Sequence, residues 1–176
     1  MFTVVALTLV MPATFLISDS SQAVEPISLG AADGFAILAG AGITNAGETN
    51  VLGHIGSNPT VTVTGQATIT QTGSLHLGDD TSIQAKSDLQ AAFDAASALT
   101  STNTIAGNLG GLTLSPGVYT SAATIAITGN LILDAGGDAN AVFVFQAGST
   151  LDVAASSEIT LINGGSVDHV YWKVGS

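Results

Sequence analysis

The last third of the chain contains two copies of one pattern, and this repeat constrains the fold more than any other feature. Gly136-Gly137 recurs as Gly164-Gly165, and the closing Gly148-Ser149 recurs as Gly175-Ser176. Each copy carries three short apolar runs that are separated by Gly or Ala-Ser corners. A unit of three short strands cannot bury its apolar side alone, but a stack of such units can. The repeat therefore predicts a triangular β-solenoid.

Upstream of the repeat, the pattern changes twice. Residues 29–55 hold short apolar runs broken by glycines, which favour short strands joined by tight turns. Residues 60–77 alternate Thr with Val or Ile, the period of a strand with one apolar face. Because Thr60, Thr62 and Thr64 follow Asn58-Pro59, we assign them to a connecting segment rather than to a functional face.

Residues 80–99 show the period of a helix. Apolar side chains recur at steps of three and four residues, and neither Gly nor Pro interrupts the segment. Asp79 and the residues that follow it supply N-cap groups and negative charge for the positive end of the helix dipole. We expect one helix of about five turns. Its narrow, alanine-rich docking stripe would comprise Ile83, Leu89, Ala92, Phe93, Ala96 and Leu99.

The charge balance and the cysteine count exclude several classes of function. The formal net charge is −11 with two basic residues, which is too few for a nucleic-acid interface. The absence of Cys excludes disulfides, thiolate metal sites and cysteine catalysis. No hydrolase, phosphate-loop or zinc-peptidase motif occurs, and His54, His76 and His169 lack metal-site spacing. We expect a monomer without catalytic residues, cofactors or a bound metal.

The N-terminus predicts export from the cytoplasm. Residues 2–17 carry no charge, and Ser21-Gln22-Ala23 places small residues at the positions that precede a cleavage site. A membrane anchor is the alternative, but the apolar run is shorter than the roughly 18–20 residues that span a bilayer, and Pro12 interrupts it. We expect residues 1–23 to be a secretory signal peptide. Residues 24–176 would then form a secreted domain that has no membrane contact after cleavage.

A series of short motifs connects the chain to a known family. They are Phe35-Ala36-Ile37-Leu38-Ala39, Gly53-His54-Ile55-Gly56-Ser57-Asn58-Pro59, Leu114-Ser115-Pro116-Gly117-Val118-Tyr119, Gly136-Gly137-Asp138-Ala139-Asn140-Ala141 and Val170-Tyr171-Trp172-Lys173-Val174-Gly175. In this order they resemble the microbial β-helical ice-binding (antifreeze) proteins. The resemblance implies a β-dominated fold, a discontinuous right-handed β-solenoid with one long helix packed along its side. Family members continue for further coils beyond the strand that contains Trp172, so the resemblance implies a domain that is incomplete at its C-terminus.

The resemblance also implies that the protein binds ice through a flat face of the solenoid. Neighbouring strands lie about 4.7–4.9 Å apart and alternate residues about 6.6–6.8 Å apart, which is close to the repeats of ice. Thr is short and stiff at χ1, and many weak sites act together. The Thr-Ala/Gly-x-Thr/Asn motif of the family is only approximated at residues 123–126 and 149–152. The candidate ice-binding residues are Thr68, Thr70, Thr72, Thr124, Ala126, Thr128, Ser149 and Thr150.

Three other interpretations compete with this assignment. Outward Thr on any single strand is also explained by β-propensity alone. A cell-surface adhesive or structural β-solenoid would carry the same repeats, and ice-affinity capture separates it from an ice-binding protein. A polysaccharide-cleaving β-helix enzyme generally gathers basic residues and carboxylates in a groove, which two basic residues do not supply. The preferred prediction is a secreted ice-binding protein that inhibits ice growth or recrystallisation.

Overall fold

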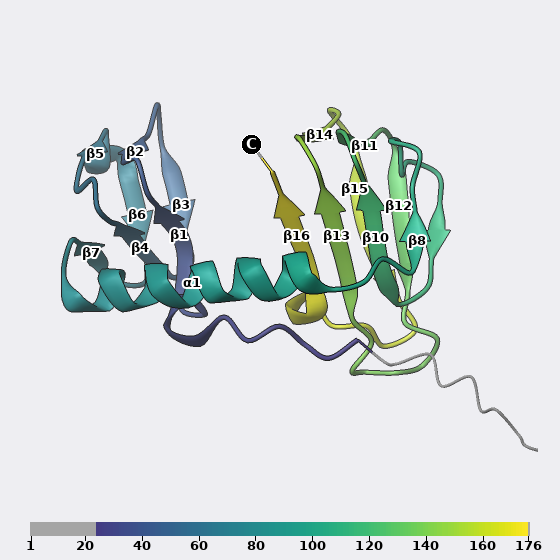
Figure 1. Cartoon of the computed structure of the whole chain (residues 1–176). Helices are drawn as coiled ribbons and strands as arrows, with labels where there is room; N and C mark the ends of the chain where they lie inside the picture. The colour runs from purple at the N-terminus through teal and green to yellow at the C-terminus, as the bar shows by residue number, and fades with distance from the viewer. Residues whose placement is uncertain (1–23, 176) are drawn as a thin grey trace, which may run out of the picture.

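The computed structural model describes residues 24–175, so the predicted signal peptide lies outside the described residues. Within this range, short strands form two separate stacks that are joined by one long helix (Figure 1). Strand pairing is parallel throughout and joins strands that are one coil apart. Both stacks are therefore β-solenoids, and the predicted solenoid with one long helix along its side is confirmed.

The first stack is formed by residues 35–77. Each coil makes three short strands, and each strand pairs with its equivalent in the next coil. A short 3-10 helix, η1 (Gly30–Ala32), precedes the stack, and another, η2 (Gln66–Thr68), lies in its second coil. The three sheets are β1 (Phe35–Ala39), β4 (His54–Ser57) and β7 (Leu75–Leu77); β2 (Ile43–Thr44) and β5 (Val63–Thr64); and β3 (Thr49–Val51) and β6 (Ile69–Gln71).

The second stack contains the sequence repeat. Leu131 pairs with Ile159 and Phe143 with Val170, so the two copies lie directly on each other. A 3-10 helix, η3 (Val167–His169), leads into the last strand. The sheets are β8 (Asn103–Thr104), β10 (Gly117–Ser121), β13 (Phe143–Ala147) and β16 (Val170–Val174); β11 (Ile125–Ile127) and β14 (Leu151–Val153); and β9 (Thr113–Leu114), β12 (Asn130–Asp134) and β15 (Glu158–Ile162).

The predicted helix is α1 (Asp80–Ala98), which runs along both stacks (Figure 1). Asp79 is its N-cap, and the carboxylate accepts a 2.8 Å hydrogen bond from the amide of Ser82. The predicted docking stripe was only partly right, because Ile83 is 48% exposed and Phe93 is 40% exposed. Small side chains allow a helix to approach a sheet closely, so the buried face consists of Ser82, Ala85, Ala92 and Ala96.

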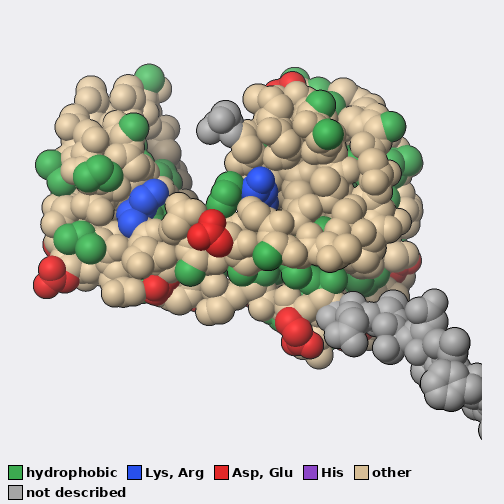
Figure 2. Space-filling model, in the orientation of Figure 1, with side chains coloured by type: hydrophobic (Ala, Val, Ile, Leu, Met, Phe, Trp, Pro, Cys, Tyr) green, Lys and Arg blue, Asp and Glu red, His purple; other side chains and the backbone are tan. Residues whose placement is uncertain are grey.

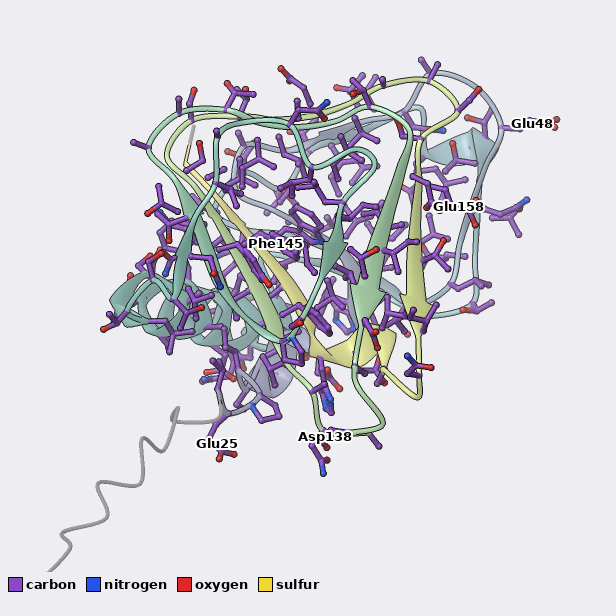
Figure 3. All side chains as sticks on the ribbon, turned by 90° about the vertical axis from the view of Figure 1, so that its right-hand side faces the viewer. Glu25, Glu48, Asp138, Phe145 and Glu158 are labelled. Atoms are coloured by element: carbon purple, nitrogen blue, oxygen red, sulfur yellow. The ribbon has the colours of Figure 1, made fainter. Side chains whose placement is uncertain are left out.

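Aromatic rings form a column inside the second stack. Tyr119, Phe145 and Trp172 occupy equivalent positions of three successive coils. The ring centroids of Tyr119 and Phe145 lie 5.4 Å apart, and those of Phe145 and Trp172 lie 4.0 Å apart. Phe145 has no exposed surface and points into the solenoid interior (Figure 3). The rings are therefore core residues rather than a surface platform for sugars.

The path of the chain leaves two solenoid edges facing each other. Helix α1 carries the chain from β7 to the far end of the second stack, and the later coils build back toward the first stack (Figure 1). Within the described residues β16 pairs only with β13, and β1 pairs only with β4. The open space between these edges is a deep hollow in the molecular surface (Figure 2).

None of the helices among residues 24–175 combines the length and the apolarity needed to cross a bilayer.

The ring column generates a test of what stabilises the stack. Replacing Phe145 with Ala removes a fully buried ring between two others, and we expect it to lower the free energy of unfolding by about 3–5 kcal/mol. Urea unfolding followed by circular dichroism measures the loss. Phe93→Ala is the matched control, because Phe93 is 40% exposed on α1 and should cost much less. Equal losses in the two variants would contradict the assignment of Phe145 to the core.

The helix cap generates a test of pH dependence. The amide of Ser82 and then the ring of His76 donate hydrogen bonds to Asp79, and both lower the pKa of Asp79 below its ordinary value of 3.8. A carboxylate with a lowered pKa stabilises the fold above its ordinary pKa, and this contribution is lost as the pH falls through the folded-state value. Asp79→Asn keeps a capping oxygen without the titrating group.

We therefore expect Asp79→Asn to be less stable than the wild type at neutral pH, with the difference disappearing in acid well below 3.8. Thermal unfolding followed across this pH range measures the difference. Glu158→Gln also removes one exposed carboxylate, but it removes no helix cap and should not reproduce the pattern. A difference that stays constant with pH would show that the carboxylate of Asp79 does not contribute through its charge.

Candidate functional site

The coil order divides the solenoid surface into three sides. The helix side carries β1-β4-β7 and β16-β13-β10-β8; the threonine side carries β2-β5 and β11-β14; and the mixed side carries β3-β6 and β9-β12-β15. The two sheets of the threonine side lie along the top of Figure 1. A ligand with an extended flat surface needs a side of the protein that is open, flat and chemically uniform. The three sides differ in these properties.

Helix α1 packs across the helix side, where it contacts β1 and β7 of the first stack and β13 and β16 of the second. Gln146 of β13 fixes the C-terminal end of the helix, because its side-chain amide donates to the carbonyl oxygens of Ala96 at 2.7 Å and Leu99 at 3.1 Å. The hydroxyl of Thr120 donates to the other end of the same amide group. The polar groups of this side are therefore used to dock the helix.

The mixed side is open, but its outward groups differ from coil to coil. Asn130 lies opposite Glu158, Ile132 opposite Thr160, and Asp134 opposite Ile162. Charged, aliphatic and hydroxyl groups thus alternate along the solenoid axis. Figure 3 shows Glu158 at the outside of this side. Such a surface does not repeat one chemical group at one spacing.

The threonine side repeats hydroxyl groups in register. The hydroxyls of Thr124 and Thr150 lie 2.9 Å apart, in neighbouring coils. In the next outward row, Ala126 lies opposite Asp152. In the first stack Thr44 of β2 lies opposite Thr64 of β5, and both are exposed. Short neutral side chains therefore occupy most of this side.

Strand β11 of the threonine side is anchored by buried side chains, whereas Val153 of β14 is 56% exposed. Ile125 and Ile127 have no exposed surface, and they pair with Leu151 and Val153 of the next coil. Because side chains alternate along a strand, these inward anchors force Thr124 and Ala126 to point outward. β-Branching at Thr restricts χ1 further, so the hydroxyls are held in fixed directions.

The structure brings together four of the predicted residues on this side. Thr124, Ala126 and Thr150 lie on or immediately beside β11 and β14. Ser149 lies at the preceding corner, where its amide donates to the carbonyl oxygen of Ala123 at 3.2 Å. These four form one connected patch across two coils.

The other four predicted residues do not join this patch as free groups. Thr70 lies on β6 opposite Asn50 and therefore belongs to the mixed side. Thr68 and Thr72 also lie in that part of the chain. The hydroxyl of Thr68 donates to the carbonyl oxygen of Gly65, and the hydroxyl of Thr72 accepts a hydrogen bond from the amide of Gly53 in the neighbouring coil. Thr128 accepts a 2.6 Å hydrogen bond from the side chain of Asn108. Grouping Thr68, Thr70 and Thr72 with Thr124 on one face was wrong, because β6 is equivalent to β12 and not to β11.

The sequence analysis did not predict that Thr44 and Thr64 lie opposite each other on the threonine side. The assignment of Thr64 to a connecting segment is wrong, because Val63–Thr64 is the strand β5 and pairs with Ile43–Thr44. The alternation of Thr60, Thr62 and Thr64 was the available signal. Its partner β2 is two residues long and lies among glycines, so no sequence period reveals the pairing.

His54 and His76 take structural positions. The rings of Phe35, His54 and His76 contact one another, with centroid distances of 5.2–5.6 Å. His54 accepts a 2.9 Å hydrogen bond from the amide of Ser74, and His76 lies 2.8 Å from the Asp79 carboxylate. Within residues 24–175 no group of three His, Cys, Asp or Glu side chains is arranged to hold a metal ion.

The Gly-Gly repeat marks a turn that an aspartate stabilises. Asp134 accepts hydrogen bonds from the Asn163 side chain at 2.7 Å and from the Gly136 amide at 2.9 Å. These bonds, the one from Asn163 first, lower the pKa of Asp134. Gly136 and Gly137 both have positive φ, which L side chains rarely adopt. This part of the repeat is therefore a turn motif rather than a cation site.

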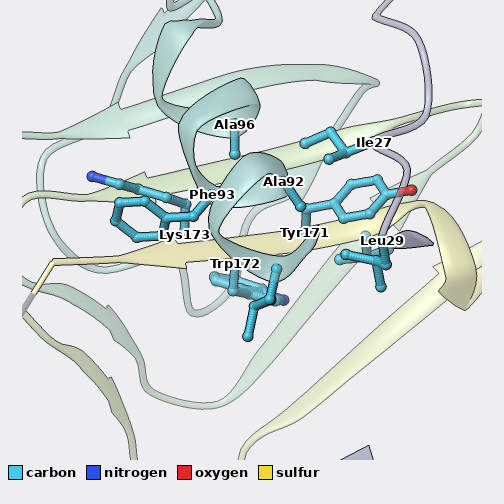
Figure 4. Close-up of a pocket in the computed structure, with 10 residues that line it drawn as sticks. Ile27, Leu29, Ala92, Phe93, Ala96, Tyr171, Trp172 and Lys173 are labelled. Carbon is cyan, nitrogen blue, oxygen red and sulfur yellow. The ribbon is translucent and has the colours of Figure 1, made fainter. Parts of the chain in front are cut away.

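An apolar cavity of about 200 Å³ lies between α1 and β16 (Figure 4). Phe93 of the helix, Tyr171 and Trp172 of the strand, and Ile27 and Leu29 of the N-terminal segment line it. The ammonium of Lys173 lies 4.9 Å from the centre of the Phe93 ring. No acid, base and nucleophile converge there, so the cavity does not have the arrangement of a catalytic site.

Comparison with known proteins agrees with this geometry. Residues 37–176 match the model of a family described as ice-binding-like. An ice-binding protein from Nostoc sp. strain HG1 is 37% identical over 149 residues, which cover 84% of this chain and 55% of that protein. The chain thus spans little more than half the length of this relative.

Solved structures give the same result for the fold. The ice-binding protein of the Antarctic ascomycete Antarctomyces psychrotrophicus superposes with a TM-score of 0.82 at 43% identity, covering 85% of this chain and 74% of that one. An ice-binding protein from an Antarctic biological consortium superposes with a TM-score of 0.83 at 36% identity, covering 99% and 74%.

Proposed function

Because the chain belongs to the ice-binding-like family, we propose that it binds ice through the β11-β14 sheet of the threonine side. The observation that carries this proposal is the pair of hydroxyls on Thr124 and Thr150, 2.9 Å apart in neighbouring coils. The relatives described above support ice as the ligand. Adsorption at this sheet would inhibit ice growth or recrystallisation.

The physical basis is a match between two repeating lattices. Strands of a solenoid repeat about every 4.7–4.9 Å and alternate residues about every 6.6–6.8 Å. Thr124 and Thr150 each offer a methyl group and a hydroxyl, and Ala126, two residues after Thr124, adds only a methyl group to the surface. A single hydroxyl binds a water weakly, so a useful affinity requires several sites that engage at once. Rigid inward anchors at Ile125 and Ile127 keep those sites aligned.

We infer that the protein acts by binding alone, without a catalytic step, and works as a monomer outside the cell. The charge of −11 and the two basic residues disfavour nucleic acid as a partner. The predicted leader at residues 1–23 supports secretion, and N-terminal sequencing of the secreted protein would test it. An adhesive solenoid at the cell surface remains the alternative that an ice-capture experiment would reveal.

The face assignment predicts that one bulky substitution abolishes activity while a matched one does not. Thr124→Tyr places a ring on the β11-β14 sheet and should remove thermal hysteresis and crystal faceting in nanolitre osmometry of the full chain. Ala126→Tyr should act in the same way, because a protruding ring prevents close contact with ice. Thr70→Tyr is the control, since it places the same ring on the mixed side.

Circular dichroism of each variant establishes that the fold is intact. Loss of activity in Thr70→Tyr with retention in Thr124→Tyr would move the ice-binding site to the mixed side. A folded wild-type chain that leaves crystals round and stays out of ice during ice-affinity capture would overturn the proposal that the β11-β14 sheet of this chain binds ice.

A further inference from the structure

Asp152 is the one charged residue of strands β11 and β14 on the threonine side. It lies on β14 in register with Ala126 of β11, and it is exposed. The residue two positions before it is Thr150, whose hydroxyl contacts Thr124. Because alternate residues of a strand point to the same face, the carboxylate projects from the same surface as the hydroxyl pair.

Several other aspartates accept hydrogen bonds from the described residues, although Asp33 and Asp80, like Asp152, do not. Asp88 accepts hydrogen bonds from the amide of Ala31 and the side chain of Gln84, and Asp79 and Asp134 cap a helix and a turn. Asp152 has no hydrogen bond or ion pair with the described residues, and Lys173 lies over the Phe93 ring instead. The carboxylate of Asp152 therefore faces solvent on the threonine side, and no described side chain offsets its charge.

A charge at this position works against adsorption to ice. A carboxylate in water organises several strongly bound water molecules around itself, and a crystal of neutral water contains no cation to replace them. Bringing the face against ice would remove part of this hydration without compensation. The free-energy cost of removing this hydration is greatest in the row that contains Ala126 and Asp152, because the carboxylate lies there. It is smaller in the row that contains Thr124 and Thr150.

We propose that Asp152 limits the affinity of the proposed ice-binding face, because it confines tight contact to the Thr124–Thr150 row and holds the affinity for ice below what the sheet would otherwise reach. This inference rests on the proposed function, because it concerns the same face. The side chain acts by its charge and hydration and not through the fold, since it contacts no other described side chain by a hydrogen bond.

The test compares three variants of the full chain. Asp152→Thr extends the hydroxyl array into the second row, and Asp152→Asn removes the charge with little change in shape. Glu158→Gln is the matched control, because it removes one exposed carboxylate from the neighbouring mixed side. Circular dichroism and thermal unfolding verify that all three are folded. Thermal hysteresis, and the fraction captured in a slowly growing ice hemisphere, are then measured at equal concentration.

We expect Asp152→Thr to raise thermal hysteresis several-fold, Asp152→Asn to raise it less, and Glu158→Gln to leave it unchanged. An equal rise in Glu158→Gln would attribute the effect to net charge and overturn the inference. A wild type that enters ice while Asp152→Thr gains nothing would overturn the inference but keep the proposed function. Failure of both the wild type and Asp152→Thr to enter ice would overturn both, whereas capture of Asp152→Thr alone would overturn ice binding by the wild type and show that Asp152 prevents it.

Discussion

Parallel pairing between strands one coil apart is the interaction on which the rest of this structure depends. It joins the main-chain groups of strands in successive coils by hydrogen bonds, and it superposes their side chains. The same register that stacks Phe145 on Trp172 inside the solenoid places Thr124 beside Thr150 outside it. The core and the proposed ice-binding face are therefore two products of one ladder of hydrogen bonds, and a shift of register would disrupt both.

Helix α1 connects the two short stacks and packs against both of them. Its N-cap at Asp79 lies beside the first stack, the carboxylate of Asp88 holds the Ala31 amide at 2.7 Å, and Gln146 of the second stack binds its C-terminal carbonyls. Small residues on its buried face permit close contact with both stacks. By covering the helix side, α1 also leaves only two sides of the solenoid open to a large flat ligand.

The two open sides have the same backbone but different outward side chains. On the mixed side, the second stack alternates between charged, aliphatic and hydroxyl groups. On the threonine side, short neutral groups dominate, and Asp152 is the exception on the β11-β14 sheet. Inward positions are constrained by packing, so the chemical difference between the sides comes entirely from outward positions. Changes at those positions can alter the affinity for a surface without disturbing the core.

The sequence by itself determined the elements whose signal is local or repeated. The two Gly-Gly copies predicted stacked coils, the unbroken helical period predicted α1 from residue 80, and the family motifs predicted ice binding. It also supplied Thr124, Ala126, Ser149 and Thr150, which lie in the repeat. Only the tertiary structure decided which side each threonine occupies, because strands of two or three residues carry no period that distinguishes one corner of a coil from the next. In the structure Thr70 lies on the mixed side, Thr64 lies opposite Thr44, and Thr128 accepts a hydrogen bond from Asn108. The structure also showed that close docking selects the smallest side chains of α1, since contact with a sheet depends on the distance between backbones and not on hydrophobicity alone.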